Sequence, residues 1–428
     1  MNVIINSLNI SGDVPIPPSK SLSHRAIIAA SLSENMTSTV ENLIFSKDIL
    51  ATIDSCRAFG AKIDIYEDKV LITGSKVKRI NNVVNSNESG STVRFMIPIL
   101  LTIGESVTFT GENNLVNRPL DPYLDIFDKK GISYKKGDAY LPLTVYDSLK
   151  AGNYSLKGDV SSQFITGLLY ALPLLDGSST IEITTPLMSK GYVDLTLDVL
   201  NKYGIIIKNN NYKSFYIEGN QKYCAADYRV EGDYSQSAFF LLAASFGADI
   251  KLIGMNENSL QGDKKIISDL NKFGGNVSFL NGTLVAEKSF FHDSLIDMSQ
   301  TPDLGPALSV FASLVPGKTT LFNAERLRIK ECDRITSMVT ELNKLGANAS
   351  ETKDSISFLG VKQFKSGTVS GHNDHRVVMA LTMARLKSNG PIKILGAEAV
   401  NKSFPHFFKL LESLGADITY EWVRKKQT

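Results

Sequence analysis

The sequence predicts an α/β protein that repeats one structural unit six times and divides into two lobes. A glycine that ends an amphipathic segment recurs about every 70 residues, at Gly60, Gly131, Gly204, Gly274, Gly346 and Gly415. A second series lies near the starts of apolar helices, at Ser21, Ser91, Ser162, Gln236, Leu304 and His375. Short β-branched segments between these positions indicate strands. Features common to all six units are expected to hold the fold, and features that differ are candidates for a functional site.

The fifth unit shows the predicted order of elements. Residues 303–314 form an apolar helix that ends before Pro316 and Gly317, and residues 319–323 form a β-branched strand. An amphipathic helix over 333–345 ends at Gly346, because glycine readily adopts the left-handed conformation after a helix. Residues 349–359 then predict a strand or hairpin.

The other units repeat this order. Equivalent strands are expected at 106–110, 179–184, 249–253 and 392–395. The first helix of each unit is apolar nearly all round, as at 239–244 and 377–383, so it should be buried, whereas amphipathic second helices such as 335–342 should lie on the surface.

Six such units cannot share one core, so two lobes of three units are expected. The repeat phase assigns residues 16–229 to the first lobe and residues 1–15 plus 230–428 to the second. The strand 3–5 completes the second lobe, and 15–18 cross between the two. The six helix starts, three per lobe, are expected to face a cleft between the lobes, which is the predicted site.

Composition limits the class of protein. The 428 residues are 43% hydrophobic and 21% charged with a net charge of +2, as in an ordinary globular protein, and there is no strong basic excess for coating nucleic acid. Cys56, Cys224 and Cys332 have no metal or disulfide spacing, which fits a reducing cytoplasm. We expect no signal peptide, no membrane span and no metal. The basic stretch 424–426 reads as a solvated terminus.

Cationic and polar side chains gather at the helix starts despite the low net charge. Helix starts offer unpaired N–H groups and a partial positive charge, and arginine pairs with phosphate or carboxylate through two hydrogen bonds. This pattern favours a ligand with several phosphate or carboxylate groups. The cations concerned are Lys20, Arg25, Arg94, Arg118, Arg326, Arg328, Lys330, Arg334, Arg376 and Lys402.

Each residue also has a simpler interpretation. Ser161 and Ser162 are typical helix N-caps, and Gly90 is typical of a turn. Asp303 suits the first turn of any helix, and His375 alone would be a structural histidine. Their recurrence at one position of successive units is what favours a site.

Six motifs, in order along the chain, resemble the 5-enolpyruvylshikimate-3-phosphate synthase family. They are KSLSHR at 20–25, ESGSTVR at 88–94, GDVSSQF at 158–164, RIKECDR at 328–334, DHR at 374–376 and KSFP at 402–405. The resemblance runs from residue 15 to about residue 415. It implies an inside-out α/β prism, the enolpyruvyl transferase fold, with three βαβαββ units in each lobe.

The resemblance implies the activity of a 3-phosphoshikimate 1-carboxyvinyltransferase. Such an enzyme transfers the enolpyruvyl group of phosphoenolpyruvate to the 5-hydroxyl of shikimate 3-phosphate and releases phosphate. This reaction belongs to the shikimate pathway of aromatic amino acid biosynthesis. No cofactor is implied, since phosphoenolpyruvate carries the activated group. A cytoplasmic monomer that binds neither nucleic acid nor membrane is expected.

Motif matching also assigns site residues. The implied proton carriers are Asp303, Glu331 and Lys20, with Asp303 as the base. The implied shikimate 3-phosphate ligands are Lys20, Ser21, Arg25, Ser161, Ser162, Gln163, Ser189, Asp303 and Lys330. The implied phosphoenolpyruvate ligands are Lys20, Gly90, Arg118, Gln163, Arg334, Arg376 and Lys402.

Two alternatives remain open. A UDP-N-acetylglucosamine enolpyruvyl transferase shares the fold and chemistry, but it carries a catalytic cysteine before its Arg-Pro, where this chain has Asn113 before Arg118 and Pro119. A non-catalytic clamp on nucleic acid would need basic residues at equivalent surface positions of every unit, which the sequence lacks.

Overall fold

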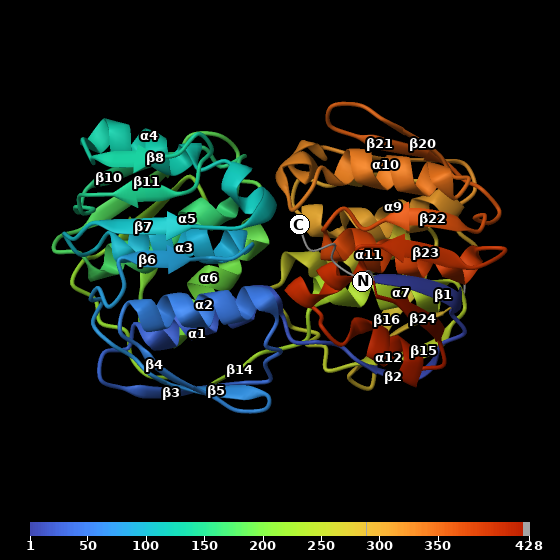
Figure 1. Ribbon diagram of the computed structural model, residues 1–428, viewed down its shortest axis with the longest axis horizontal. Coiled ribbons are helices and arrows are strands. Elements are labelled where there is room, and N and C mark those ends of the chain that lie inside the picture. The colour runs from blue at the N-terminus through green and yellow to red at the C-terminus, as the bar shows by residue number, and fades with distance from the viewer. Residues whose placement is uncertain (288, 423–428) are drawn as a thin grey trace. The chain divides into compact units, whose positions relative to one another are not determined.

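The computed structural model describes residues 1–287 and 289–422 (Figure 1). The basic stretch 424–426 lies outside these residues. The chain forms two compact units. The central unit is Pro18–Glu231, and the terminal unit is Met1–Pro17 with the described residues from Gly232 onward. The order of helices and strands in each confirms the predicted α/β repeat.

The central unit has three four-stranded sheets. Their strand orders are β14(Tyr228–Arg229)-β3(Thr37–Glu41)-β5(Lys69–Thr73)-β4(Lys62–Ile65), β6(Val83–Asn85)-β7(Val107–Thr110)-β9(Leu143–Val145)-β8(Tyr134–Lys136) and β10(Asn153–Leu156)-β11(Ser179–Ile183)-β13(Ser214–Ile217)-β12(Ile207–Asn210). Its inner helices are α1 (Lys20–Ser31), α3 (Gly90–Leu100) and α5 (Ser162–Ala171), and its amphipathic helices are α2 (Lys47–Ala58), α4 (Asp121–Lys130) and α6 (Lys190–Lys202).

The terminal unit repeats this architecture. Its sheets are β2(Ser11–Pro15)-β15(Asp249–Ile253)-β17(Thr283–Glu287)-β16(Asn276–Leu280), β18(Leu295–Asp297)-β19(Lys318–Phe322)-β21(Ile356–Leu359)-β20(Asn348–Glu351) and β22(Gly367–Ser370)-β23(Ile392–Leu395)-β1(Asn2–Ser7)-β24(Asp417–Glu421). Its inner helices are α7 (Tyr234–Ser245), α9 (Gly305–Leu314) and α11 (His375–Ala384), and its amphipathic helices are α8 (Lys265–Lys272), α10 (Arg334–Lys344) and α12 (Phe407–Ser413).

Three sheets each take one strand from a distant part of the chain. β14 pairs in parallel with β3, and β2 pairs in parallel with β15. β14 and β2 are thus edge strands of sheets whose other strands come from a distant part of the chain. β1 lies between β23 and β24, antiparallel to both. The N-terminal strand 3–5 is therefore paired inside the terminal unit. The other three sheets, those of β6, β10 and β18, each form from one continuous stretch.

The inner helices form the core of each unit, as their apolar composition predicts. Every residue of α7 is buried, and so are residues 22–31 of α1. In the central unit, α3 and α5 approach closely at Gly167, where a side chain would collide with Tyr123 Oη and the Arg94 carbonyl. Buried helices of this kind hold their N-terminal residues in fixed positions, which is what a binding site needs.

Candidate active site

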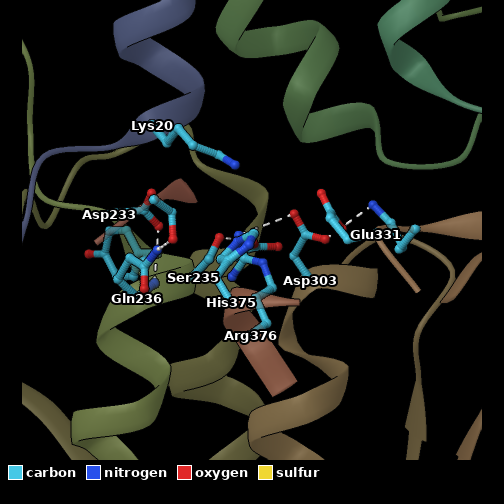
Figure 2. A network of polar contacts seen from close by, with 12 residues as sticks. Lys20, Asp233, Ser235, Gln236, Asp303, Glu331, His375 and Arg376 are labelled. Carbon is cyan, nitrogen blue, oxygen red and sulfur yellow. Dashed lines mark hydrogen bonds and ion pairs between the residues drawn. The ribbon is translucent and has the colours of Figure 1, made fainter. Parts of the chain in front are cut away.

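In the terminal unit, Asp303 lies at the centre of an ionic cluster. It sits in the 3₁₀ helix η4 (Pro302–Leu304), directly before α9. Its Oδ1 lies 3.1 Å from Lys330 Nζ and 2.9 Å from Arg334 Nη1. Its Oδ2 lies 3.3 Å from Arg376 Nη2, at the start of α11 (Figure 2). Three cations thus share one carboxylate.

Arg334 links this cluster to two further carboxylates. It is the first residue of α10 and its side chain is 1% exposed. Its Nε donates to Asp374 Oδ2 at 2.7 Å, and its Nη2 donates to Glu331 Oε2 at 2.7 Å. Asp374 also accepts the Arg376 N–H at 2.8 Å as the N-cap of α11. The guanidinium is therefore held in one orientation, as bidentate anion recognition requires.

The pKa values of this cluster follow from burial and charge. Burial alone would raise the pKa of Asp303, but Arg376, Lys330 and Arg334 hold it well below its usual range. Burial lowers the pKa of Lys330 to about 8, against the opposing effect of Asp303. Asp303 is therefore ionised at neutral pH, and Lys330 is close to losing its proton.

Lys402 approaches the cluster from a different element. It ends the 3₁₀ helix η7 (Ala397–Lys402), and its buried side chain donates from Nζ to the Asn373 carbonyl at 2.6 Å. Asn373 directly precedes Asp374, so Lys402 and Arg334 are both anchored on one short segment. All the site residues predicted in this unit are thus connected: Asp303, Lys330, Glu331, Arg334, Arg376 and Lys402.

Asp263 is a carboxylate in this region that the sequence motifs did not identify. It lies in the 3₁₀ helix η3 (Gly262–Lys264) and accepts a hydrogen bond from Ser235 Oγ at the start of α7. Burial raises its pKa to about 6, and the charge of Asp303 adds to this effect. Ser235 and the neighbouring Gln236 are visible in Figure 2 beside the start of α11. Asp263 follows strand β15 rather than opening an apolar helix, so the repeat pattern gave no signal for it.

In the central unit, the serines at the helix starts act first as N-caps. Ser19 accepts from Leu22 N–H at the start of α1, and Ser89 accepts from Thr92 N–H at the start of α3. Ser161 accepts from Gln163 N–H at the start of α5. The structural interpretation of Ser161 is therefore correct, and a ligand role for it stays a prediction.

Arg25 connects the starts of α1 and α6. The guanidinium is buried, and it donates from Nε to Thr196 Oγ1 at 2.9 Å and from Nη2 to the Tyr192 carbonyl at 3.0 Å. Its Nη1 donates to the Ser21 carbonyl at 2.8 Å. Tyr192 N–H in turn donates to the Ser189 carbonyl. Three predicted ligands, Ser21, Arg25 and Ser189, thus lie together.

A second group forms at the starts of α3 and α5. Gln163 accepts from Arg94 Nη1 at 2.7 Å and donates from Nε2 to Ser91 Oγ at 2.8 Å. A Cβ on Gly90 would lie 2.6 Å from Arg118 Nη1. Only glycine lets the Arg118 guanidinium rest on the first turn of α3, which explains Gly90 without a left-handed backbone.

Lys20 is paired with an acid that sequence reasoning missed. Its Nζ lies 2.9 Å from Asp48 Oδ2, and both side chains are largely buried. Asp48 is in the first turn of α2, where an acid is ordinary for a helix start, so nothing in the sequence marked it. The pair holds the lysine at the first position of α1.

Neither a metal-binding cluster nor a helix that could cross a membrane is present among the described residues. Among residues 1–287 and 289–422, no group of three or more His, Cys, Asp or Glu side chains is arranged to hold a metal ion. No helix in the same residues is long and apolar enough to cross a membrane. Cys332 has a strongly raised pKa, chiefly through burial, and is therefore a protonated thiol.

The fold is that of an α/β repeat protein, and its helix starts carry the cations that a multiply charged anion would need for binding. The family model described as EPSP synthase (3-phosphoshikimate 1-carboxyvinyltransferase) matches residues 5–411. The chain therefore belongs to the EPSP synthase family, which confirms the resemblance in the sequence motifs.

Individual relatives agree with this assignment. The 3-phosphoshikimate 1-carboxyvinyltransferase of Clostridium novyi is 47% identical over 98% of this chain and 99% of its own length. That of Clostridioides difficile is 46% identical over 96% of this chain and 97% of its own length. The solved EPSP synthase of Acinetobacter baumannii matches with a TM-score of 0.80 and 27% identity, over 98% of this chain and 99% of that one. This likeness confirms the enolpyruvyl transferase fold.

Proposed function

We propose that this protein transfers the enolpyruvyl group of phosphoenolpyruvate to the 5-hydroxyl of shikimate 3-phosphate, with release of phosphate. The observation that carries the proposal is the Asp303 cluster, in which a largely buried carboxylate is surrounded by Lys330, Arg334 and Arg376. A general base and anion-binding cations are thereby held at one point. Membership of the EPSP synthase family supports this assignment, and so do the relatives named 3-phosphoshikimate 1-carboxyvinyltransferase.

The two substrates fit two sets of residues. Shikimate 3-phosphate carries a phosphate and a carboxylate, and we assign it to Lys20, Ser21, Arg25, Ser161, Ser162, Gln163, Ser189, Asp303 and Lys330. Phosphoenolpyruvate also carries a phosphate and a carboxylate, and we assign it to Lys20, Gly90, Arg118, Gln163, Arg334, Arg376 and Lys402. Because the sets draw on both units, we propose that residues of both units hold the reactants jointly.

The reaction needs two proton transfers in each half. In the addition, the 5-hydroxyl oxygen bonds to C2 of phosphoenolpyruvate, its proton leaves, and another proton adds to C3 to form a methyl group. In the elimination, C3 loses a proton, the C2–O bond to phosphate breaks, and the oxygen of that bond takes up a proton as phosphate departs. Asp303 is proposed as the base for the hydroxyl, and Glu331 and Lys20 as the carriers for C3.

The charges around Asp303 suit this role when substrate binds. In the unliganded protein its neighbours hold the pKa of Asp303 well below the usual range, so it is a weak base. Anionic groups that bind Arg376, Lys330 and Arg334 would neutralise these cations and raise the pKa of Asp303. The base would therefore strengthen when the substrates are in place.

The experiment that tests this function identifies the product. Unmodified protein incubated with shikimate 3-phosphate and phosphoenolpyruvate should form 5-enolpyruvylshikimate 3-phosphate, detected by mass spectrometry, and should form no product with UDP-N-acetylglucosamine. Asp303→Asn should lose at least 10²-fold in kcat while still binding shikimate 3-phosphate in calorimetry. Product from the sugar nucleotide alone would overturn the function, and undiminished turnover by Asp303→Asn would remove Asp303 as the base.

We further propose that the protein acts as a monomer in the cytoplasm. Its three cysteines, Cys56, Cys224 and Cys332, are all free thiols. Unpaired cysteines fit a reducing compartment.

A further inference from the structure

Glu341 is a buried carboxylate that contacts none of the predicted ligands. It lies on α10, and its side chain is 1% exposed. Its Oε1 lies 2.7 Å from His372 Nε2, and its Oε2 accepts the Ser370 N–H at 3.0 Å. Lys344 Nζ reaches both oxygens at 2.9 Å from the solvent side, where the lysine is 49% exposed.

Glu341 is ionised in this environment. Burial alone would raise its pKa, but Lys344, the Ser370 N–H and His372 lower it. An ionised carboxylate only accepts hydrogen bonds, so His372 Nε2 must be the donor. Charge-assisted bonds of this kind are stronger than those between neutral groups. Ser370 and His372 are therefore firmly held to α10.

The segment that Glu341 holds is the one that anchors two proposed phosphoenolpyruvate ligands. Residues 370–374, here called the 370–374 turn, run from the end of β22 to the N-cap of α11. Within this turn, the Asn373 carbonyl accepts from Lys402 and the Asp374 carboxylate accepts from Arg334. His372 and Asn373 have φ values of 48° and 52°, a left-handed conformation that is uncommon outside glycine and that asparagine and histidine adopt more readily than most other residues.

The turn is attached to α10 at two points. Arg334 bonds to Asp374 at the first turn of the helix, and Glu341 bonds to Ser370 and His372 seven residues further on. Positions seven apart lie on the same helix face, about two turns away from each other. The turn is also bonded to β23, where the Gly371 N–H donates to the Leu395 carbonyl, and the two attachments to α10 add to this bond in fixing its orientation.

We propose that Glu341, acting through His372, is a positioning residue for phosphoenolpyruvate. It holds the 370–374 turn so that Arg334 and Lys402 present their cations in the binding geometry. This inference rests on the proposed function, because it concerns ligands assigned there. It adds residues outside the six motifs to the residues that determine phosphoenolpyruvate affinity.

The test measures the KM for phosphoenolpyruvate and the KM for shikimate 3-phosphate separately. Glu341→Gln keeps the shape of the side chain but places an NH₂ group against the donors of His372 or Lys344. We expect the KM for phosphoenolpyruvate to rise about tenfold, which corresponds to about 1.4 kcal/mol, with kcat and the KM for shikimate 3-phosphate within about twofold of the unmodified protein. His372→Asn should change the same KM in the same direction, because asparagine accepts the left-handed backbone of this position but lacks the Nε2 atom that contacts Glu341.

Lys344→Met is the matched control. It removes an ion pair from the same carboxylate but no contact to the 370–374 turn, so both KM values should stay unchanged. Equal increases in both KM values, or no increase for phosphoenolpyruvate in either Glu341→Gln or His372→Asn, would overturn the inference. Absence of turnover in the unmodified protein would instead count against the proposed function.

Discussion

At the residue scale, one site contains a carboxylate that is a weak base, Asp303, and a lysine whose pKa lies near neutral pH, Lys330. Asp303 is ionised because three cations surround it, and the pKa of Lys330 falls to about 8 because it is buried among them. Asp303 is the largest charge effect on the pKa of Lys330, whereas burial and the charge of Arg376 act more strongly on the pKa of Asp303 than Lys330 does. Substrate binding should therefore change with pH near pH 8, where a lysine with an ordinary pKa of about 10.4 stays protonated.

This sensitivity gives a pH prediction. Lys330 is protonated below about pH 8 and neutral above it, so the affinity for shikimate 3-phosphate should fall as pH rises from 7 to 9. The second ionisation of a phosphate monoester, near pH 6, is complete by then. Lys330→Arg stays charged and should keep its affinity up to pH 10. Calorimetric titration across this range checks both proteins, and identical profiles would show that Lys330 does not control binding.

The motif residues were predictable from sequence, but their partners were not. Lys330, Glu331 and Arg334 lie within one short motif, and the structure brings them together with Asp303. Asp48 and Asp263 come from other elements, and Glu341 lies further along the helix that Arg334 begins. Each of the three contacts residues that are distant in the sequence. An acid in the first turn of a helix or on an amphipathic face looks ordinary in sequence, and only the fold shows that it is buried beside a cation.

At the element scale, the inner helices determine where the site residues lie. Periodicity and apolar composition predicted these helices, since a helix that is apolar all round must be buried. The strands β1, β2 and β14, which join sheets formed by distant parts of the chain, were harder to predict. β14 has two residues, Tyr228 and Arg229, and its pairing with β3 joins positions far apart in the chain. Local patterns carry no information about such pairing.

The contact between α3 and α5 gives a stability prediction. A Cβ at Gly167 would collide with Tyr123 Oη and the Arg94 carbonyl, and it would lie 2.8 Å from Pro98 Cγ. Gly167→Ala should therefore reduce the free energy of unfolding by about 3 kcal/mol. Gly104→Ala is the control, because no heavy atom lies within 4 Å of its Cβ position. Denaturant titration measures both, and a Gly167→Ala variant as stable as Gly104→Ala would show that the helices separate easily.

At the scale of the whole molecule, the chain is two units with the same architecture and different helix starts. The shared sheets and inner helices explain the sixfold pattern in the sequence. The units differ in the residues to which we assign the chemistry, which are Arg25 with Ser21 and Ser189 in the central unit and the Asp303 cluster in the terminal unit.

The central proposal is that Arg25 and Lys330 both bind shikimate 3-phosphate. It is tested most directly by steady-state phosphate release with Arg25→Met in the central unit and Lys330→Met in the terminal unit. Each substitution removes one cation proposed to bind shikimate 3-phosphate. Each should raise the KM for shikimate 3-phosphate at least tenfold, since a charge-assisted hydrogen bond contributes about 1.5–3 kcal/mol. A KM within twofold of the unmodified protein for either variant would contradict the claim.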